Sequence, residues 1–489
     1  MSGPHEDRMS VPQPLSFHRR AADALSTPDL PQKIERATAR LVAARHASFA
    51  AFPEGEALRD EARAIRARVV GHLDQHLIRF EAELQKRGGH LHWAATDDDA
   101  RRIVVGIARA HEVRNVVKGK SMVSEEIELN GALEAAGVHV VETDLGEYVA
   151  QLAGEPPSHI VGPIIHKSRE DVAAVFREKL DAAEEDVSDA ARMTALARRT
   201  LRAEFLRADM GISGTNFGVA ENGSICLVTN EGNGRLTTSL PRVHVALLGL
   251  ERIVPTVADL AIMLRLLARS ATGQKLTVYS NLLSGPRRRH PSGSEAASEP
   301  DGPDEVHVVL VDNGRSELLG TELAEILYCI RCGACLNTCP VFQNVGGHAY
   351  GSVYSGPVGA VLTPALRGLD GFADLPHASS LCGACREICP VRIDIPRMLL
   401  ALRAKGARRS DTPAWVRQGL RMYAWLARRP RLFAVAARAA RVATRMGARD
   451  GWRRSLPGPL AGWTDHRDFP VFAPRSFQRL WRERERRKP

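Results

Sequence analysis

Two cysteine-rich motifs in the last third of the chain have the residue types and spacing that bind iron–sulfur clusters. The first, CIRCGACLNTCP at 329–340, follows the pattern C-x2-C-x2-C-x3-C and ends in proline. The second, CGACREICP at 382–390, has three cysteines and also ends in proline. In two-cluster ferredoxin motifs, the cysteine before the proline binds the cluster of the other motif. The spacing therefore predicts two interlocked cluster sites held by seven thiolates.

This pattern assigns the seven cysteines to two groups, which we call the first and the second cysteine site. The first cysteine site consists of Cys329, Cys332, Cys335 and Cys389. The second cysteine site consists of Cys339, Cys382 and Cys385. We expect two iron–sulfur clusters as cofactors, both of the four-iron type if the second site finds a fourth ligand.

The second cysteine site is one thiolate short, and the spacing puts Ser379 at the missing position. Three interpretations stay open. A three-iron cluster needs only the three cysteines; a four-iron cluster can take Ser379, His377 or water as its fourth ligand; or a partner subunit donates it.

Two further points bear on the cysteines. Paired C-x2-C motifs also bind zinc, but the first motif fits the geometry of an iron–sulfur cubane more tightly. Cys226 stands alone in SICLVTN and is expected to be a small buried core residue.

Two clusters in interlocked motifs lie close together, so the sequence predicts an electron relay. Backbone N–H groups of the CGAC loops are expected to donate hydrogen bonds to the sulfurs.

The rest of the chain must position these motifs. Short apolar runs such as VHVVETD, HIVGPIIH, SICLVTN, VHVALLGL and VHVVLVDN read as strands, and SEEIELNGALEAAG, REDVAAVFREKLDAA and TVADLAIMLRLLARSATG read as helices. This alternation predicts an α/β fold with a mainly parallel sheet. Helical spacing between about 30 and 90 predicts a pair of amphipathic helices before it. The predicted divisions are an N-terminal helical segment 1–95, an α/β domain 96–315, an α-helical ferredoxin-type module 316–400 and a basic tail 401–489.

The α/β domain offers candidate ligands but no recognisable catalytic set. VVKGKS resembles half of a phosphate loop, because its first glycine would fall at Arg114. The glycine-rich GISGTNFGVAENG and NEGNGRL can approach an anion through backbone N–H groups, with Lys118, Lys120 or Arg235 as carboxylate partners, or can simply build turns. Candidate general bases are Glu142, Asp144, Glu147 and His159. The catalytic residues stay unassigned.

The tail differs from the rest of the chain in charge. Residues 401–489 hold 23 Lys or Arg against six Asp or Glu, and five of the six tryptophans. Aromatic residues at helical spacing among arginines favour docking on an acidic partner or an anionic membrane surface, or form a solvated basic face. No nucleic-acid-binding module is recognisable, so no nucleic-acid partner is expected.

Several segments together resemble the bacterial lactate utilization protein B family, from about residue 20 to 400. They are VVKGKSMVSEEIELN, VETDLGEYVAQLAGEPPSHIV, GISGTNFGVAENGSICLVTNEGNGRL, DNGRSELLG, CIRCGACLNTCPVF, GGHAYGSVYSGPVGAVLTP and SSLCGACREICPVRIDIP. The resemblance implies the iron–sulfur subunit of a nicotinamide-independent system that oxidises L-lactate to pyruvate, with lactate utilization proteins A and C as partners. It also implies an α/β domain similar in fold to isomerase and CoA-transferase proteins.

Three classes of function follow. The leading one is an electron-transfer subunit for L-lactate oxidation, or for another 2-hydroxy acid such as glycolate. The second is a hydro-lyase that uses the incomplete cubane as a Lewis acid, and the third is a redox-sensing regulatory protein. No signal peptide or membrane span is evident. We therefore expect a cytoplasmic protein, with peripheral contact at the inner face of the membrane and a quinone-linked acceptor as a further prediction.

Overall fold

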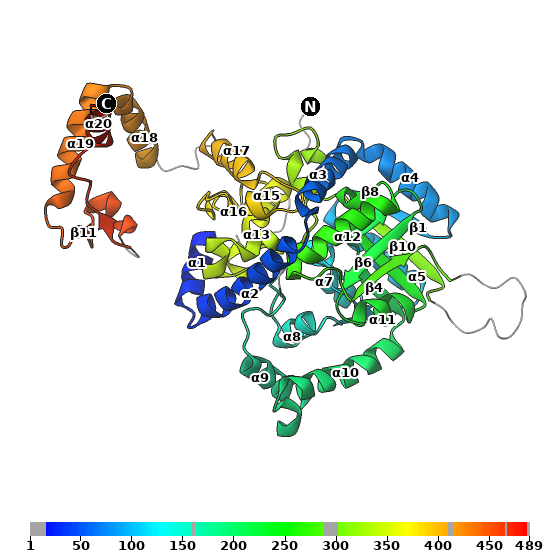
Figure 1. Cartoon of the computed structure of the whole chain (residues 1–489). Helices are drawn as coiled ribbons and strands as arrows, with labels where there is room; N and C mark the ends of the chain where they lie inside the picture. The colour runs from blue at the N-terminus through cyan, green and yellow to red at the C-terminus, as the bar shows by residue number, and fades with distance from the viewer. Residues whose placement is uncertain (1–15, 159–161, 288–301, 409–413, 465–466, 487–489) are drawn as a thin grey trace, which may run out of the picture. The chain divides into compact units, whose positions relative to one another are not determined.

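The computed structural model describes residues 16–158, 162–287, 302–408, 414–464 and 467–486 (Figure 1). The chain divides into two compact units, one up to Gly406 and one from Ala407. The first unit contains both large sheets and all seven cysteines of the two cysteine sites. Within the described residues, no helix combines the length and apolar character needed to cross a membrane.

A six-stranded parallel sheet lies at the centre of the first unit (Figure 1). Its strands, in spatial order, are β1 (His90–Ala94), β10 (Glu305–Val311), β7 (Val243–Gly249), β4 (Met210–Gly214), β2 (Asn115–Lys118) and β3 (His139–Glu142). Every residue of β7 is buried, as expected for a strand covered on both faces of a parallel sheet. The predicted α/β class is therefore confirmed.

A second, four-stranded sheet contains SICLVTN, which we had placed in a mainly parallel sheet. Its strands are β8 (Ile253–Val254), β5 (Phe217–Val219), β6 (Ser224–Thr229) and β9 (Tyr279–Leu283), and β6 pairs antiparallel with both neighbours. Gly223, in the turn between β5 and β6, has a φ of +65°, and a Cβ there would lie 2.3 Å from the backbone nitrogen of Leu84. This part of GISGTNFGVAENG therefore builds a tight hairpin.

Helices cover the large sheet and extend beyond it. They are α1 (Phe17–Ser26), α2 (Leu30–Ala50), α3 (Gly55–Gly71), α4 (Leu73–Lys86), α5 (Asp97–Ala110), α6 (Met122–Glu126), α7 (Leu129–Ala135), α8 (Leu145–Ala153), α9 (Arg169–Leu180), α10 (Ala190–Arg207), α11 (Asn233–Ser239) and α12 (Val257–Thr272). Strand β1, which ends at Ala94, pairs with β10 of the large sheet. The large sheet therefore begins before residue 96, where the sequence predicted the start of the α/β domain.

Two expected elements also differ from the prediction. SEEIELNGALEAAG is split into α6 and α7, because Glu128 between them has a left-handed φ of +53°. HIVGPIIH was expected to be a strand, but residues 163–166 form turns and 159–161 lie outside the described residues. The polar interruption at Glu128 leaves the apolar pattern nearly unchanged, so periodicity alone does not reveal it. In HIVGPIIH, the Gly162–Pro163 pair is a turn signal that outweighs the apolar run.

The cysteine module shares its hydrophobic core with the rest of the first unit. Its helical segments are η5 (Ala324–Tyr328), α13 (Ala334–Asn337), α14 (Pro340–Val345), η6 (His348–Tyr350), α15 (Gly356–Arg367), η7 (Leu375–His377), α16 (Ala384–Ile388) and α17 (Ile395–Arg408). One continuous core contains Ile34 of α2, Phe80 of α4, Leu336 of α13 and Leu402 of α17. The module is therefore packed into the first unit and not attached by a linker.

The second unit consists of short helices and one small hairpin. They are α18 (Ala414–Ala427), α19 (Pro430–Arg445), α20 (Phe477–Glu485) and the antiparallel pair β11 (Trp452–Arg453) and β12 (Phe469–Pro470). None of the described residues in α18, α19 or α20 is buried. Arg429 and Arg467 lie over the rings of Trp425 and Trp463, at 4.2 and 4.1 Å from their centroids. The tail thus exposes its aromatic residues beside its arginines.

Candidate metal centre

Both C-x2-C loops have the same local structure. Cys332 and Cys382 are each followed by a glycine in the left-handed region, Gly333 with a φ of +76° and Gly383 with a φ of +86°. Each glycine caps a short helix, α13 or α16, and these two helices pack against each other. The contact between the helices brings the two cysteine motifs together, although more than 40 residues separate them.

The four cysteines of the first cysteine site lie within electrostatic range of one another. The half-buried Cys335 thiol interacts electrostatically with Cys329, Cys332 and Cys389, and also with Cys385 of the second site. Burial raises the pKa of Cys332 to about 12 and that of Cys389 to about 11. Four neighbouring cysteine sulfurs are the donor set that a four-iron cluster requires, so these residues fit that group. Metal binding would release the thiol protons.

Backbone N–H groups point at the sulfurs of the first cysteine site. The nitrogen of Arg331 donates to Cys329 Sγ at 3.4 Å. Ala334 donates to the Cys332 sulfur, and Val391 and Ile393 donate to the Cys389 sulfur. Donors of this kind stabilise the more negative, reduced form of a cluster. The predicted N–H donation from the cysteine loops is thus present in the fold.

Buried arginines from distant elements hold the backbone around the first cysteine site. Arg59 Nη2 donates to the carbonyl oxygen of Cys389 at 2.9 Å, and Arg252 Nη1 donates to that of Cys329 at 2.5 Å. Arg45 Nη2 donates to Ile388 O and Arg66 Nη2 to Leu327 O, each at 2.9 Å. The sequence analysis predicted amphipathic helices between about 30 and 90 but assigned no role to any of these four arginines. Arg59 and Arg66 lie seven residues apart, on the same helix face as Ala62 and Val69. This spacing is the sequence pattern that could have identified the two arginines as buried.

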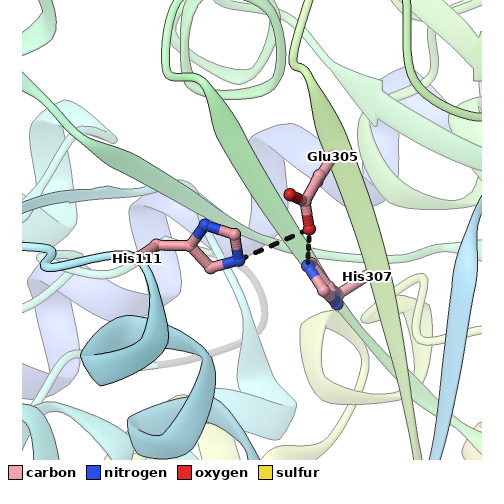
Figure 2. A group of neighbouring side chains, drawn as sticks. All are labelled: His111, Glu305 and His307. Atoms are coloured by element: carbon pink, nitrogen blue, oxygen red, sulfur yellow. Dashed lines mark ion pairs between the residues drawn. The ribbon is translucent and has the colours of Figure 1, made fainter.

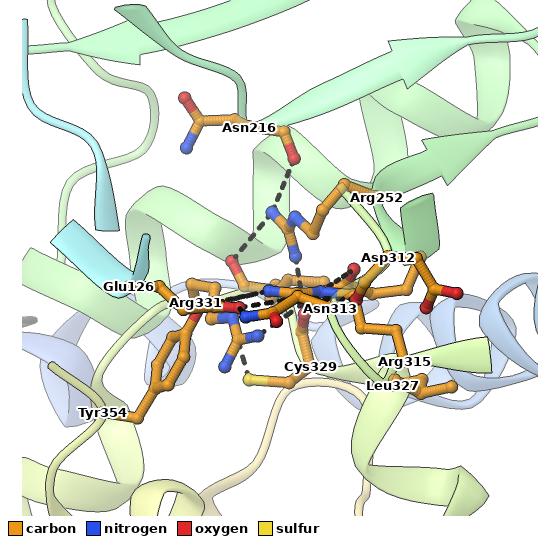
Figure 3. Close-up of polar contacts among 12 residues, drawn as sticks. Glu126, Asn216, Arg252, Asp312, Asn313, Arg315, Leu327, Cys329, Arg331 and Tyr354 are labelled. Atoms are coloured by element: carbon orange, nitrogen blue, oxygen red, sulfur yellow. Dashed lines mark hydrogen bonds and ion pairs between the residues drawn. The ribbon is translucent and has the colours of Figure 1, made fainter. Parts of the chain in front are cut away.

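A buried charge network joins the first cysteine motif to the large sheet (Figure 3). Arg315 Nη2 lies 2.6 Å from Glu126 Oε2, and Arg315 Nε lies 2.9 Å from Glu251 Oε2. Glu251 in turn pairs with Arg331 at 3.3 Å. Burial would raise the pKa of Glu126, but the charge and hydrogen bonds of Arg315, with further bonds from Tyr354 and Asn313, hold that pKa at about 2. Arg331 is thereby fixed between Cys329 and Cys332.

The second cysteine site is more open. Its thiols, Cys339, Cys382 and Cys385, interact with one another, and Cys382 is exposed. Ser379 Oγ accepts a hydrogen bond from the nitrogen of Leu381 at 3.1 Å. His377 is exposed, and its electrostatic neighbours are Arg403, His18 and Asp374. Both proposed fourth ligands therefore have other neighbours, and the completion of this site stays a prediction.

Tyr350 is a residue beside the second cysteine site that the sequence did not reveal. Its ring is fully buried and packs against Phe17, with the centroids 5.3 Å apart. Its hydroxyl interacts electrostatically with Cys339 and Cys335, and it has no hydrogen-bond partner among the residues that the structure describes. An unpartnered buried hydroxyl is costly. A cluster sulfur at this point would give it an acceptor.

A cavity of about 540 Å³ reaches from the large sheet to the first cysteine motif. Lys120, after β2, and Gly214, at the end of β4, line it, and Arg331 and Cys332 lie at its other side. The carboxyl ends of parallel strands are a common place for ligands. A small anion in this cavity would therefore lie beside the first cysteine site.

The structure separates the other candidate residues of the α/β domain. Lys118, predicted as an anion ligand, is instead fully buried and pairs with Glu142 at 2.7 Å. Arg235 is exposed and does not line this cavity. Asp144 lines it but also caps α8. Glu147 lines a different cavity, of about 880 Å³, and His159 lies outside the described residues.

Three segments of the chain match known families. Residues 77–311 match the LUD domain, residues 325–393 the 4Fe-4S dicluster domain, and residues 400–486 the C-terminal region of lactate utilisation protein B. The second match covers all seven cysteines of both sites. It identifies the cofactors of the module as iron–sulfur, while the assignment of each cysteine stays a prediction.

Whole-length relatives agree with these matches. The chain is 45% identical to lactate utilization protein B of Geobacillus thermodenitrificans, over 88% of this chain and 89% of the relative. It is 42% identical to lactate utilization protein B of Shouchella clausii, over 96% and 97% of the two chains. It is also 42% identical to the uncharacterized electron transport protein YkgF of Escherichia coli, over 95% and 96%.

One solved structure, of a DUF162 family protein from Deinococcus radiodurans, aligns with 49% of this chain and 98% of its own. At 16% identity and a TM-score of 0.25, this likeness supports no conclusion about the fold or function of this chain. The three relatives do show the family, since each is more than 40% identical over at least 88% of this chain. The chain therefore belongs to the lactate utilization protein B family.

Proposed function

We propose that this protein is the electron-transfer subunit of a multi-protein, nicotinamide-independent system that oxidises L-lactate to pyruvate. The observation that carries the proposal is the packing of α13, which contains Cys335 of the first site, against α16, which contains Cys385 of the second. Two clusters held by these residues would be close enough to exchange an electron. We infer lactate as the substrate from the names of the relatives. The same pair of clusters would also suit a system that oxidises glycolate.

In this proposal, the first cysteine site holds a four-iron cluster and the second holds a three-iron or four-iron cluster. An iron–sulfur cluster, when bound, accepts one electron and passes it on. Arg45, Arg59 and Arg252 place positive charge around the first site, which stabilises the added electron. The apolar core around Ile330 and Val391 excludes water. The exposed Cys382 provides an edge where a partner can approach.

The overall reaction needs partners. Oxidation of a 2-hydroxy acid to a 2-oxo acid releases two electrons and two protons, and a relay of this kind carries the electrons one at a time. We propose that homologues of lactate utilization proteins A and C complete the system, with a quinone-linked acceptor taking both electrons. The exposed Trp415 and Trp425, among arginines, suit docking on such a partner or on an anionic membrane surface.

The proposal is tested by mixing the anaerobically purified, cluster-loaded protein with its A and C partners. L-lactate should then produce the electron paramagnetic resonance signals of reduced clusters, and D-lactate and omission of either partner serve as controls. No reduction in the complete mixture would contradict the proposal. Reduction by glycolate but not by lactate would keep the relay and change the substrate.

The same samples separate the other two classes of function. A hydro-lyase would convert a 2-hydroxy acid without reducing either cluster and without partners. A redox-sensing regulator would show DNA binding that depends on cluster oxidation and weakens with salt. Either result, without lactate-driven reduction, would replace the electron-transfer proposal.

A further inference from the structure

A group of histidines lies on the large sheet, in a region that the iron–sulfur function does not use. His111 follows α5, and Glu305 and His307 lie near the start of β10. One ligand atom from each of these three residues lies within 4.8 Å of the other two, as Figure 2 shows. We call this group the histidine site. Imidazole and carboxylate are the ligands that zinc accepts most readily after thiolate.

The distances in the histidine site fit a tetrahedral metal. Nε2 of His111 lies 3.4 Å from Glu305 Oε2, and Nε2 of His307 lies 3.3 Å from the same oxygen. Ligand atoms about 2.0 to 2.1 Å from a tetrahedral zinc ion are separated by about 3.3 Å. Two of the three edges therefore already have the length that zinc requires. The third edge, between His111 and His307, is no longer than 4.8 Å.

The other ring nitrogen of His307, Nδ1, contacts a neighbouring side chain, as is common for histidines that bind metal. Its Nδ1 lies 3.0 Å from Nε2 of His92, across the β1 and β10 pair. A histidine that binds metal usually donates its second N–H to a fixed acceptor, which sets the tautomer and orients the ring. With the proton on Nδ1, the lone pair of His307 Nε2 faces Glu305.

Nε2 of His307 faces the Glu305 carboxylate from a buried ring. The His307 side chain is buried, and Nε2 has no hydrogen-bond partner among the described residues despite its closeness to Glu305. A metal ion between Nε2 of His307 and Oε2 of Glu305, which lie 3.3 Å apart, would be bound by both atoms.

We propose that His111, Glu305 and His307 bind one zinc ion, with water at the fourth position and His92 as a positioning residue. Such a site would tie the end of α5 to β10. Three protein ligands and one open position are the arrangement found in catalytic zinc sites. The proposal does not depend on the electron-transfer function, because none of its residues belongs to a cysteine site.

Zinc uptake by the cluster-loaded, full-length protein tests the proposal. The protein is incubated anaerobically with one to two equivalents of zinc, desalted, and analysed for zinc and iron by mass spectrometry. We expect one zinc per chain with unchanged iron. The variants His111→Ala and His307→Ala should lose the zinc and keep the iron. The control is His139→Ala, an exposed histidine at the start of β3 that lies 3.8 Å from Glu204.

Retention of iron shows that each variant has folded, and His111→Ala changes only a half-buried side chain. Zinc bound equally by the parent and by His111→Ala would overturn the proposal, as would no zinc in the parent. X-ray absorption at the zinc edge identifies the ligands independently. Nitrogen and oxygen at about 2.0 Å with imidazole scattering are expected, whereas sulfur at about 2.3 Å would mean that zinc had entered a cysteine site.

A final variant tests the role of His92. Because His92 acts through His307, His92→Gln should keep the ligands and weaken zinc affinity by about 10- to 100-fold. Competition with a chelator measures this change. An unchanged affinity would remove His92 from the proposal, and the loss of one imidazole from the zinc ligands would make it a ligand.

Discussion

The two cysteine sites differ in how the rest of the protein holds them. The first cysteine site has four cysteines, and arginines from α2, α3 and the segment after β7 bind the carbonyls beside them. The second cysteine site has three cysteines, one of them exposed, and the buried hydroxyl of Tyr350 lies nearby. The comparison suggests a fixed inner site and an accessible outer one. Electrons would pass between the inner cluster and a partner through the outer cluster.

The largest difference is expected when ligands are removed. Cys335→Ala should remove all the iron of the first cysteine site, about four atoms per chain, and destabilise the shared core, because binding of metal contributes to folding. Cys382→Ala should remove only the iron of the exposed second site. Iron analysis and thermal unfolding measure both effects.

Cys226→Ala is the matched control for these variants, since Cys226 is buried in β6, away from the motifs. It should keep all the iron. Equal iron loss in Cys335→Ala and Cys382→Ala would mean that the two sites do not differ in the way described.

The second prediction concerns the buried network behind the first cysteine site. Glu126→Gln leaves Arg315 without its closest carboxylate, and the loss of one partner of a buried pair costs about 3 to 5 kcal/mol of unfolding free energy. Chemical denaturation of the cluster-loaded protein measures it. The control is Glu184→Gln, whose largely exposed carboxylate pairs with the exposed Arg177, and which should cost about 0 to 1 kcal/mol.

The same carboxylate predicts a dependence on pH. The pKa of Glu126 is about 2 in the folded protein, below the value of about 4.3 in an unfolded chain. Its contribution to stability is therefore fully present above about pH 4.3 and is lost as the pH falls towards 2. Glu126→Gln should flatten the stability curve in that window. A curve that keeps its slope would show that Glu126 is not held in its ionised form.

The third prediction concerns Tyr350. If its hydroxyl donates to a cluster sulfur, Tyr350→Phe removes a hydrogen bond worth about 1 kcal/mol. That loss should lower the midpoint potential of one cluster by about 40 mV in a one-electron step. Redox titration followed by electron paramagnetic resonance measures the shift. Tyr423→Phe, at an exposed tyrosine of the tail, should change nothing, and unchanged potentials in Tyr350→Phe would remove Tyr350 from the second site.

The smallest effect is expected at Ser379. Because its oxygen already accepts a hydrogen bond from Leu381, Ser379→Ala should keep the iron content and the signals of the second site. Loss of one iron in Ser379→Ala would identify the serine as the fourth ligand. Ser379→Cys sharpens the result, since a fourth thiolate should convert a three-iron signal into that of a four-iron cluster.

The sequence predicted those features whose evidence lies within one short segment of the chain. The grouping of cysteines follows from spacing within motifs, and the parallel sheet follows from apolar runs such as VHVALLGL. Lys118 was misread, because its partner Glu142 lies 24 residues away and is brought opposite by the register of β2 and β3. Tyr350 and the buried arginines depend on packing between distant segments, which no short pattern records.

Electron transfer through this protein requires two different clusters that lie close enough to exchange electrons. Electron paramagnetic resonance of the anaerobic protein, oxidised and then reduced with dithionite, with iron and sulfide quantified, tests this most directly. We predict a reduced spectrum in which two clusters interact magnetically, and a single, unsplit cluster signal in Cys382→Ala. Two independent signals, or zinc with no signal at all, would contradict the account.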